Sequence, residues 1–122
     1  MSQSDSSNRT SPSRVEMLGS MPVASDRLAR PLSPATRCGD FVFVSGQVPT
    51  DDSGVVVTGG IEAQTRQVFK RIAAVLALAD CTLNDVAKVS VWLEDARDFA
   101  SFNRVYMECF GDHRPARSTV ES

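Results

Sequence analysis

The segment IEAQTRQVFKRIAAVLALA, residues 61–79, decides the fold class because it carries the clearest regular hydrophobic pattern in the chain. Its core-type residues recur three or four positions apart, the spacing of one face of an α-helix; they are Ile61, Thr65, Val68, Phe69, Ile72, Val75, Leu76 and Ala79. Charged and amide side chains occupy the other face, where Glu62 and Arg66 form a favourable pair four residues apart. The pattern predicts an amphipathic helix that packs against the rest of a domain.

Short β-type runs precede this helix. Residues 41–44, FVFV, form a continuous apolar run, as in a strand that is covered on both faces. We expect residues 55–57 to follow it as a hairpin strand, through a turn at residues 51–54. Residues 27–32 are expected to form a further short strand, which Pro34 ends.

After the helix, the pattern alternates and then becomes helical again. Residues 88–93 alternate between the two faces of a half-buried strand. Asp95 or Asp98 can cap the next helix and Gly111 ends it; its inner face comprises Phe99, Phe102, Val105, Tyr106, Cys109 and Phe110. Residues 117–121 form the last predicted strand. The order β-β-β-α-β-α-β predicts an α+β fold with both helices on one face of a sheet.

Composition and charge exclude several classes of function. At 122 residues, the chain is long enough for one domain with a hydrophobic core. With 13 basic and 15 acidic side chains, the formal net charge of −2 gives no electrostatic basis for a nucleic-acid partner. No apolar run approaches the roughly 20 residues of a membrane-spanning helix. The three cysteines show no metal-binding or disulfide spacing and His113 is the single histidine, so we expect free thiols, no metal and a reducing compartment, most simply the cytoplasm.

The N-terminal segment differs in composition from the rest. Residues 1–26 contain eight serines with scattered charges and prolines, and they show no helical or strand period. Such a segment buries too little apolar surface to offset the entropy of ordering. We therefore expect a disordered tail over residues 1–26 and a domain over residues 27–122. An organellar transit peptide is the alternative interpretation, although the acidic residues of this segment argue against it. Met17 and Met21 are alternative start sites of the chain.

One arginine marks a candidate binding site. Arg117 lies in the β-type run ARSTV, residues 116–120, directly after Pro115. Its guanidinium cannot lose its charge at neutral pH, so it must reach solvent or an anion. A small carboxylate is a natural partner, because its two oxygens accept two parallel N–H···O bonds. An acidic side chain of the protein itself is the alternative partner.

Several motifs resemble, in order and at the expected separations, those of the RidA/YjgF family of reactive-intermediate deaminases. The resemblance covers about residues 28–122 and rests on five groups of residues: Ser33–Ala35 with Gly39–Asp40, Phe43–Pro49, Ile61–Gln67, Asp98–Phe99 with Asn103–Tyr106, and Pro115–Ser118. It implies a chorismate-mutase-like fold, with two helices on one face of a mixed sheet. It also implies a homotrimer whose sites lie in clefts between subunits.

The activity that the resemblance implies is hydrolysis of 2-imino or 2-enamino acids to 2-oxo acids and ammonia, without metal or organic cofactor. Arg117 would then anchor the substrate carboxylate. Ser45 and Asn103 match site residues that can fix water or substrate, and Gly46 adjoins Ser45 in the same motif. As alternatives, Ser45 is only a turn residue, Asn103 serves packing, and Gly46 meets a backbone requirement.

Two features depart from the family pattern. Leu32 stands where the family's established deaminases carry a tyrosine, so an aromatic lid and its hydroxyl are missing. Family chains also continue into a further strand with a glutamate suited to water activation, and we expect this domain to be incomplete at its C-terminus, without that strand. Glu121 lies in the preceding strand and is not assigned the role. The departures favour a second hypothesis, a non-catalytic trimeric protein that binds small carboxylates. A third, RNA cleavage, fits the acidic balance and single histidine least.

Overall fold

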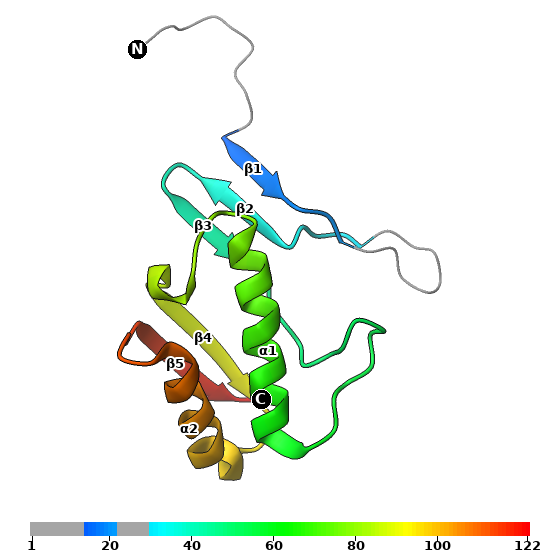
Figure 1. The fold of residues 1–122 in the computed structure, drawn as a ribbon, viewed down its shortest axis with the longest axis vertical. Coiled ribbons are helices and arrows are strands. Elements are labelled where there is room, and N and C mark those ends of the chain that lie inside the picture. Colours follow the sequence, from blue (N-terminus) through cyan, green and yellow to red (C-terminus); the bar gives the residue numbers. More distant parts are fainter. Residues whose placement is uncertain (1–13, 22–29) are drawn as a thin grey trace, which may run out of the picture. The chain divides into compact units, whose positions relative to one another are not determined.

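A computed structural model describes residues 14–21 and 30–122, and it divides the chain into two compact units, residues 1–45 and 46–122 (Figure 1). The element order within the described residues is β-β-β-α-β-α-β, and of the three strands predicted before the first helix only residues 41–44 form one. The first unit carries an antiparallel sheet, and the second carries both helices and a parallel pair of strands. The chain therefore has the α+β class expected from its sequence.

The first unit is built on a three-stranded antiparallel sheet in the order β1-β2-β3, with bounds Val15–Leu18, Ala35–Cys38 and Phe41–Val44. Cys38 pairs with Phe41, so only two residues connect β2 to β3. The first of them, Gly39, has a φ of 61°, a left-handed conformation that glycine adopts without a Cβ clash. The tight turn fixes the register of β2 on β3.

Strand β1 corrects the expectation of a disordered tail over residues 1–26. Val15–Leu18 pairs along its whole length with β2. Glu16 lies opposite Arg37, with 3.7 Å between Glu16 Oε1 and Arg37 Nε, and the two form a favourable cross-strand ion pair. Residues 1–13 and 22–26 lie outside the described residues. The composition of the segment gave no sign of this strand because its partner lies some twenty residues away in the chain.

The strands expected at residues 27–32 and 55–57 are also corrected. Residues 30–32 form no strand, and 27–29 lie outside the described residues. Pro31 and Pro34 both lack the N–H that an interior strand position donates to its neighbour. The strand β2 therefore begins only after Pro34. The turn at residues 51–54 is confirmed by a bond from the Gly54 N–H to the Asp51 carbonyl, but beyond it only an isolated bridge joins Thr50 and Val56. Pro49 stands on the opposite arm and cannot donate to extend that bridge.

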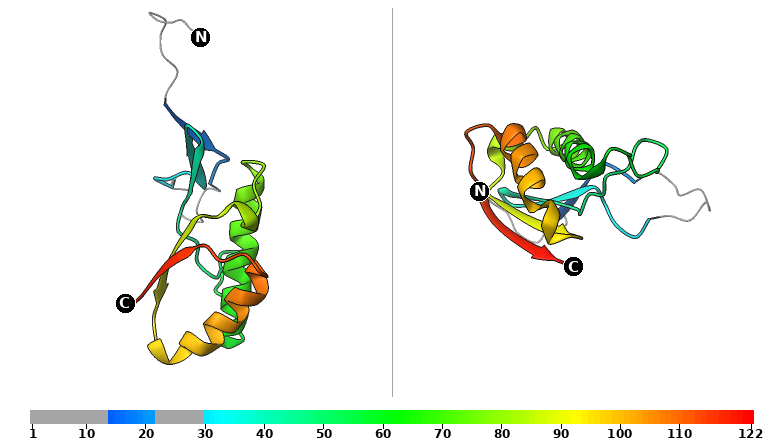
Figure 2. Two further views of the ribbon diagram at one scale, coloured as in Figure 1. Left: turned by 90° about the vertical axis from the view of Figure 1, so that its left-hand side faces the viewer. Right: turned by 90° about the horizontal axis from the view of Figure 1, so that it is seen from below.

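The second unit contains the elements that the sequence predicted most directly: helices α1 (Gly60–Ala77) and α2 (Phe99–Phe110), and strands β4 (Lys88–Leu93) and β5 (Ala116–Glu121). Short 3₁₀ turns at Leu83–Asp85 and Ala96–Asp98 precede β4 and α2. The strands are parallel, with Val89 opposite Arg117, and α2 forms the crossover between them. Both helices lie on the same side of this strand pair (Figure 2).

Of the two predicted caps, Asp95 accepts a bond from the Arg97 N–H at the 3₁₀ turn. Asp98 precedes α2 without a side-chain capping bond. Gly111 ends α2 with a φ of 63°, as expected. At the start of α1, Gly59 has a φ of 112°, and a Cβ there would lie 2.9 Å from the Ala63 Cβ. Glycine is thus required at Gly59 by both conformation and space.

The core of the second unit is aromatic. Its buried members come from α1, α2 and β4 and comprise Phe69, Leu93, Phe102, Tyr106 and Phe110. The Phe69 ring meets Tyr106 and Phe110 edge to face, at centroid distances of 5.6 and 5.2 Å. Such pairs add to the free energy gained from apolar burial. On the outside of the helix pair, Arg66 binds Glu108 at 2.7 Å and Arg104 binds Glu62.

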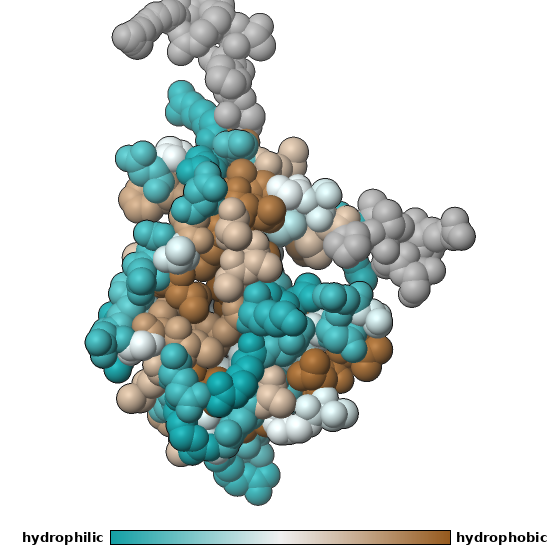
Figure 3. Space-filling model, in the orientation of Figure 1, coloured by the Kyte–Doolittle hydropathy of each residue, from teal (hydrophilic) through white to brown (hydrophobic). Residues whose placement is uncertain are grey.

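Large apolar side chains also remain on the surface, and brown patches stand among polar residues in Figure 3. In the first unit, Phe41 and Phe43 of β3 are 70% and 61% exposed. In the second unit, Trp92 of β4 and Val120 of β5 are register partners and are 68% and 48% exposed. In the parts of the chain that the structure describes, no helix has the length and hydropathy needed to cross a bilayer.

The position of Phe69 leads to a prediction about stability. Phe69→Ala should lower the free energy of unfolding by about 3–5 kcal/mol, because it removes the α1 ring on which Tyr106 and Phe110 pack. Urea denaturation at a fixed protein concentration measures this change. Leu78→Ala is the control: its side chain is 50% exposed just after α1, and it should change stability by less than about 1 kcal/mol. Equal losses in the two variants would contradict this account of the core.

Candidate functional site

The candidate site is formed where one face of α2 meets the inner face of β5. Phe99, Phe102, Asn103 and Tyr106 are spaced three or four residues apart, so they project from the same side of α2. Side chains alternate along β5, and Arg117 and Thr119 are half-buried while their neighbours are exposed. The helical and strand periods together place Arg117 against this face of α2.

The Arg117 guanidinium is held by one hydrogen bond and three rings. Its Nη1 donates to Asn103 Oδ1 at 2.8 Å. Its central carbon lies 4.7 Å from the centroid of the Tyr106 ring, 5.5 Å from that of Phe99 and 5.8 Å from that of Phe102. These distances are typical of cation–π contacts. Two of the residues predicted for the site, Arg117 and Asn103, are thus in contact, whereas the aromatic residues around Arg117 were expected only in the core.

All these partners are neutral. Within the described ranges, 14–21 and 30–122, no carboxylate forms an ion pair with Arg117. The alternative that Arg117 is neutralised by an acidic side chain thus finds no support inside this protomer. A guanidinium has several N–H donors, and the Asn103 oxygen accepts from one nitrogen. The arrangement leaves a half-buried positive charge with the capacity to bind an anion.

Two hydroxyl groups in this part of the second unit are buried: Tyr106 Oη, whose ring lies beside the guanidinium, and Thr119 Oγ1, two residues after Arg117 on β5. Burial raises the pKa of Tyr106, and the Arg117 charge opposes that effect to a smaller extent. The phenol is therefore protonated at neutral pH and available as a neutral donor or acceptor. Burial likewise raises the pKa of the Cys109 thiol, which argues against a reactive thiolate there.

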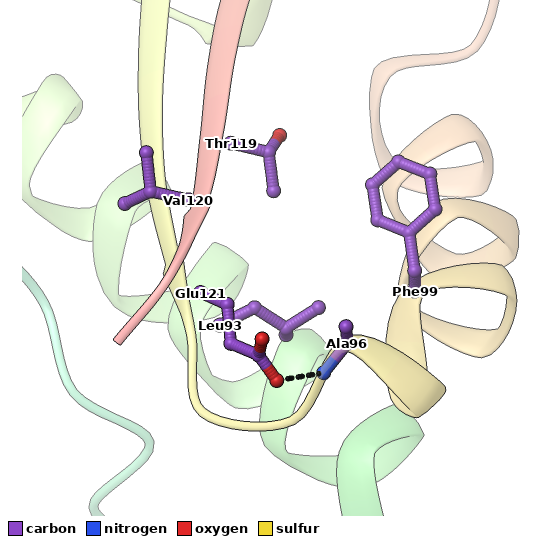
Figure 4. Close-up of a pocket in the computed structure, with 6 residues that line it drawn as sticks. All are labelled: Leu93, Ala96, Phe99, Thr119, Val120 and Glu121. Carbon is purple, nitrogen blue, oxygen red and sulfur yellow. Dashed lines mark hydrogen bonds between the residues drawn. The ribbon is translucent and has the colours of Figure 1, made fainter.

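A pocket of about 330 Å³ adjoins the cluster, and Phe99 belongs to both (Figure 4). Its lining consists of Leu93, Ala96, Phe99, Thr119, Val120 and Glu121. Figure 4 shows Thr119 and Glu121 directed from β5 toward Phe99 and Ala96, with Val120 on the opposite side of the strand. The Ala96 N–H donates to Glu121 Oε2 at 2.9 Å. Glu121 therefore ties the end of β5 to the 3₁₀ turn before α2.

The other two predicted site residues are Ser45, the last residue of the first unit, and Gly46, the first residue of the second. Ser45 Oγ donates to the Ser33 carbonyl at 2.5 Å, and the Ser45 N–H donates to the Pro34 carbonyl at 3.0 Å. Gly46 is exposed, and an added Cβ would meet no atom within 4 Å. These contacts join the end of β3 to the segment before β2, and Ser45 does not lie in a turn. The assignment of Ser45 and Gly46 to substrate binding stays a prediction.

The site residues that sequence reasoning missed are the aromatic surround of Arg117 and the pocket lining. Strand alternation was the available signal for Thr119, since it shares the inner face of β5 with Arg117. The rings carried no such signal, because a core aromatic and a ring under a cation have the same helical spacing. Over the described residues, no three His, Cys, Asp or Glu side chains gather as a metal site would require.

Comparisons with known proteins identify the family. A family model described as Endoribonuclease L-PSP matches residues 24–122. The RutC family protein PH0854 of Pyrococcus horikoshii is 50% identical over 92 residues, which is 75% of this chain and 73% of that protein. The mitochondrial protein MMF1 of Saccharomyces cerevisiae is 37% identical over 116 residues, or 92% and 80% of the two chains. The crystal structure of the YjgF gene product of E. coli superimposes with a TM-score of 0.75 at 29% identity, over 88% of this chain and 85% of that one.

The fold and the matched residues define a small α+β protein of the RidA/YjgF type. The chain belongs to the RidA/YjgF family. The resemblance seen in the sequence motifs is thus confirmed, and so is the fold that it implied.

The buried phenol at the site leads to a prediction about pH. Because its folded-state pKa is raised, the folded chain keeps the Tyr106 proton where the unfolded chain loses it. The associated stability is fully present at neutral pH and is lost as the pH rises above about 10. Urea midpoints at neutral and alkaline pH should therefore fall less in Tyr106→Phe than in the wild type. Cys109→Ala serves as the comparison variant. The pKa of the Cys109 thiol is also raised by burial, so the stability that depends on its proton should begin to be lost at about pH 9. An identical alkaline loss in wild type and Tyr106→Phe would contradict the prediction.

Proposed function

We propose that the chain hydrolyses small 2-imino or 2-enamino acids to 2-oxo acids and ammonia, with Arg117 anchoring the substrate carboxylate. The observation that carries the proposal is a half-buried guanidinium whose contacts, Asn103 and three rings, are all neutral. A carboxylate of the substrate would supply the missing negative charge through two parallel hydrogen bonds. Membership of the RidA/YjgF family, which is associated with imine and enamine deamination, supports the same reaction.

The chemistry demands little beyond orientation and proton transfer. The carbon of a 2-imine is already electrophilic, so water adds to it and gives an amino alcohol. Protonation of the nitrogen and loss of ammonia then leave the 2-oxo acid. Arg117 contributes proximity by fixing the carboxylate, and Asn103, whose oxygen accepts from Arg117, keeps its amide N–H groups for substrate or water. Ser45 is the second proposed hydrogen-bonding residue, beside Gly46. No metal or organic cofactor enters this scheme.

Activation of the water is the step for which the described residues offer the fewest candidate groups. Glu121 shares a strand with Arg117, but its carboxylate accepts from the Ala96 N–H. A backbone carbonyl or a carboxylate of another subunit would have to assist. This observation, together with Leu32 at the position of the family's tyrosine, favours the second candidate function, binding of small carboxylates without turnover.

We propose a homotrimer as the assembly, as the resemblance implies. Within the second unit, Trp92 and Val120 form an exposed apolar pair on the face of β4 and β5 opposite the helices. Exposed apolar surface of this kind is typical of subunit contacts. A site shared between subunits would also explain why residues 14–21 and 30–122 offer a substrate anchor without an ion-paired or adjacent carboxylate to act as general base. The cytoplasm remains our predicted location, although several relatives, MMF1 among them, are described as mitochondrial.

The anchor role of Arg117 is tested by ammonia release from freshly generated 2-iminobutanoate. Arg117→Ala should lower kcat/KM about 100-fold, because it removes two charge-assisted hydrogen bonds to the carboxylate. Arg66→Ala is the matched control, since Arg66 forms an exposed pair with Glu108 on the outside of the helices and should leave the rate unchanged.

The outcomes separate the candidate functions. A folded wild type that releases no ammonia above background, yet is thermally stabilised by 2-oxobutanoate, would assign the chain to the binding class. If the wild type shows no turnover and is not stabilised by 2-oxobutanoate, both functions are excluded. Cleavage of RNA by the wild type at low salt would favour the activity in the family model's description instead.

The assembly is tested by changing the exposed tryptophan. Trp92→Asp should convert a trimer into monomers in sedimentation equilibrium, because a carboxylate would be buried without a partner at the contact. Trp92→Phe keeps an aromatic surface and should remain trimeric. Circular dichroism checks that both variants retain their helices. A monomeric wild type, or a trimeric Trp92→Asp, would contradict the proposed interface.

A further inference from the structure

Arg117 needs more than its hydrogen bond to serve as a carboxylate anchor. Its side chain has several rotatable bonds, and immobilising such a chain on binding costs affinity. The bond from Nη1 to Asn103 Oδ1 fixes one nitrogen but leaves the guanidinium plane able to turn about that contact. Recognition by two parallel hydrogen bonds requires a defined plane. A second contact must therefore set the orientation.

The Tyr106 ring is suited to provide that contact. It is the nearest of the three rings to the guanidinium carbon, at 4.7 Å, and its side chain is only 6% exposed. Tyr106 and Asn103 are three residues apart on α2, so one rigid element carries both contacts. Phe99, in comparison, is 41% exposed and lies farther away.

The Tyr106 ring is itself fixed by other rings. Its centroid lies 4.8 Å from that of Phe110, 5.6 Å from that of Phe102 and 5.6 Å from that of Phe69, which belongs to α1. Close packing on three sides prevents the ring from turning away from Arg117. The support of the guanidinium thus extends through Tyr106 into the core of the second unit.

We propose that Tyr106 is a positioning residue, whose ring orients the Arg117 guanidinium so that its remaining N–H groups face the substrate carboxylate. The inference deepens the proposed function and rests on Arg117 as its anchor. We assign the role to the ring rather than to the hydroxyl, because the guanidinium carbon lies over the ring face, 4.7 Å from its centroid. Phenylalanine should therefore replace Tyr106 without loss of the anchor.

The test compares Tyr106→Phe, which keeps the ring, with Tyr106→Leu, which removes it. The first measurement is the ¹⁵N–¹H signal of the Arg117 Nε–Hε group, assigned by its absence in Arg117→Lys. This signal should be dispersed and slow to exchange with water in the wild type and in Tyr106→Phe, and should move to the position of a free arginine in Tyr106→Leu. The second measurement is calorimetric affinity for 2-oxobutanoate, which should be about three- to tenfold weaker in Tyr106→Leu alone.

The two measurements fail independently. If the wild type neither binds 2-oxobutanoate nor releases ammonia from 2-iminobutanoate, the proposed function is wrong, and the Arg117 signal still decides whether Tyr106 orients the guanidinium. If Tyr106→Leu leaves both the signal and the affinity unchanged, the proposal is overturned. An affinity loss in Tyr106→Leu with an unmoved Arg117 signal would also overturn it, because the effect would then be one of general packing.

A ring substitution covers the case in which Tyr106→Leu does not fold. Fluorinated phenylalanine at position 106 keeps the shape of the ring but withdraws electrons from its face, which weakens attraction for a cation. The Arg117 signal should then exchange faster with water than in Tyr106→Phe, while the urea midpoint stays the same. Identical Arg117 exchange in the fluorinated and unfluorinated proteins would overturn the proposal.

Discussion

The placement of a permanent charge beside an aromatic core is the constraint on which the second unit depends. Arg117 enters β5 on its inner face, where the alternation of the strand turns it toward α2. A guanidinium in that place loses much of its hydration, and the protein compensates with the faces of Tyr106, Phe99 and Phe102 and with the Asn103 oxygen. Weakly hydrated and planar, arginine tolerates such surroundings better than lysine would. Among the residues that the structure describes, no carboxylate takes part in this compensation, and the capacity of Arg117 to bind an anion follows from that.

The same aromatic residues stabilise the fold and shape the candidate site. Phe102 and Tyr106 are buried members of the core and at the same time line Arg117. The core beneath the site is therefore rigid for an ordinary packing reason, and no loop has to order itself around the guanidinium. A consequence is that substitutions in this cluster affect stability and binding together, so the two effects must be separated by readouts that respond to only one of them.

The pocket beside Phe99 continues the site along β5. Thr119 and Glu121 follow Arg117 at alternate positions, so one strand presents a cation, a hydroxyl and a carboxylate in a row toward α2. Glu121 binds the backbone of the 3₁₀ turn, which fixes the distance between the end of β5 and the start of α2. The opposite face of the same two strands carries Trp92 and Val120. One side of this short strand pair thus carries the core residues of β4 and the half-buried Arg117 and Thr119 of β5, and the other side carries the exposed Trp92 and Val120.

The sequence by itself determined the elements whose patterns are local. The helical period of residues 61–79, the alternation of residues 88–93 and the inner face of the second helix each lie within one element, and α1, β4 and α2 formed where predicted. The motifs also identified the family, and they selected Arg117 and Asn103, which the fold brings within 2.8 Å of each other. The apolar run at residues 41–44 also formed β3 as predicted. Only the tertiary structure decided β1 and β2, because Val15–Leu18 becomes a strand by pairing with residues 35–38 and has no strong period of its own. It also decided that the rings of α2 lie around Arg117, since helical spacing shows which residues share a face but not what lies opposite that face.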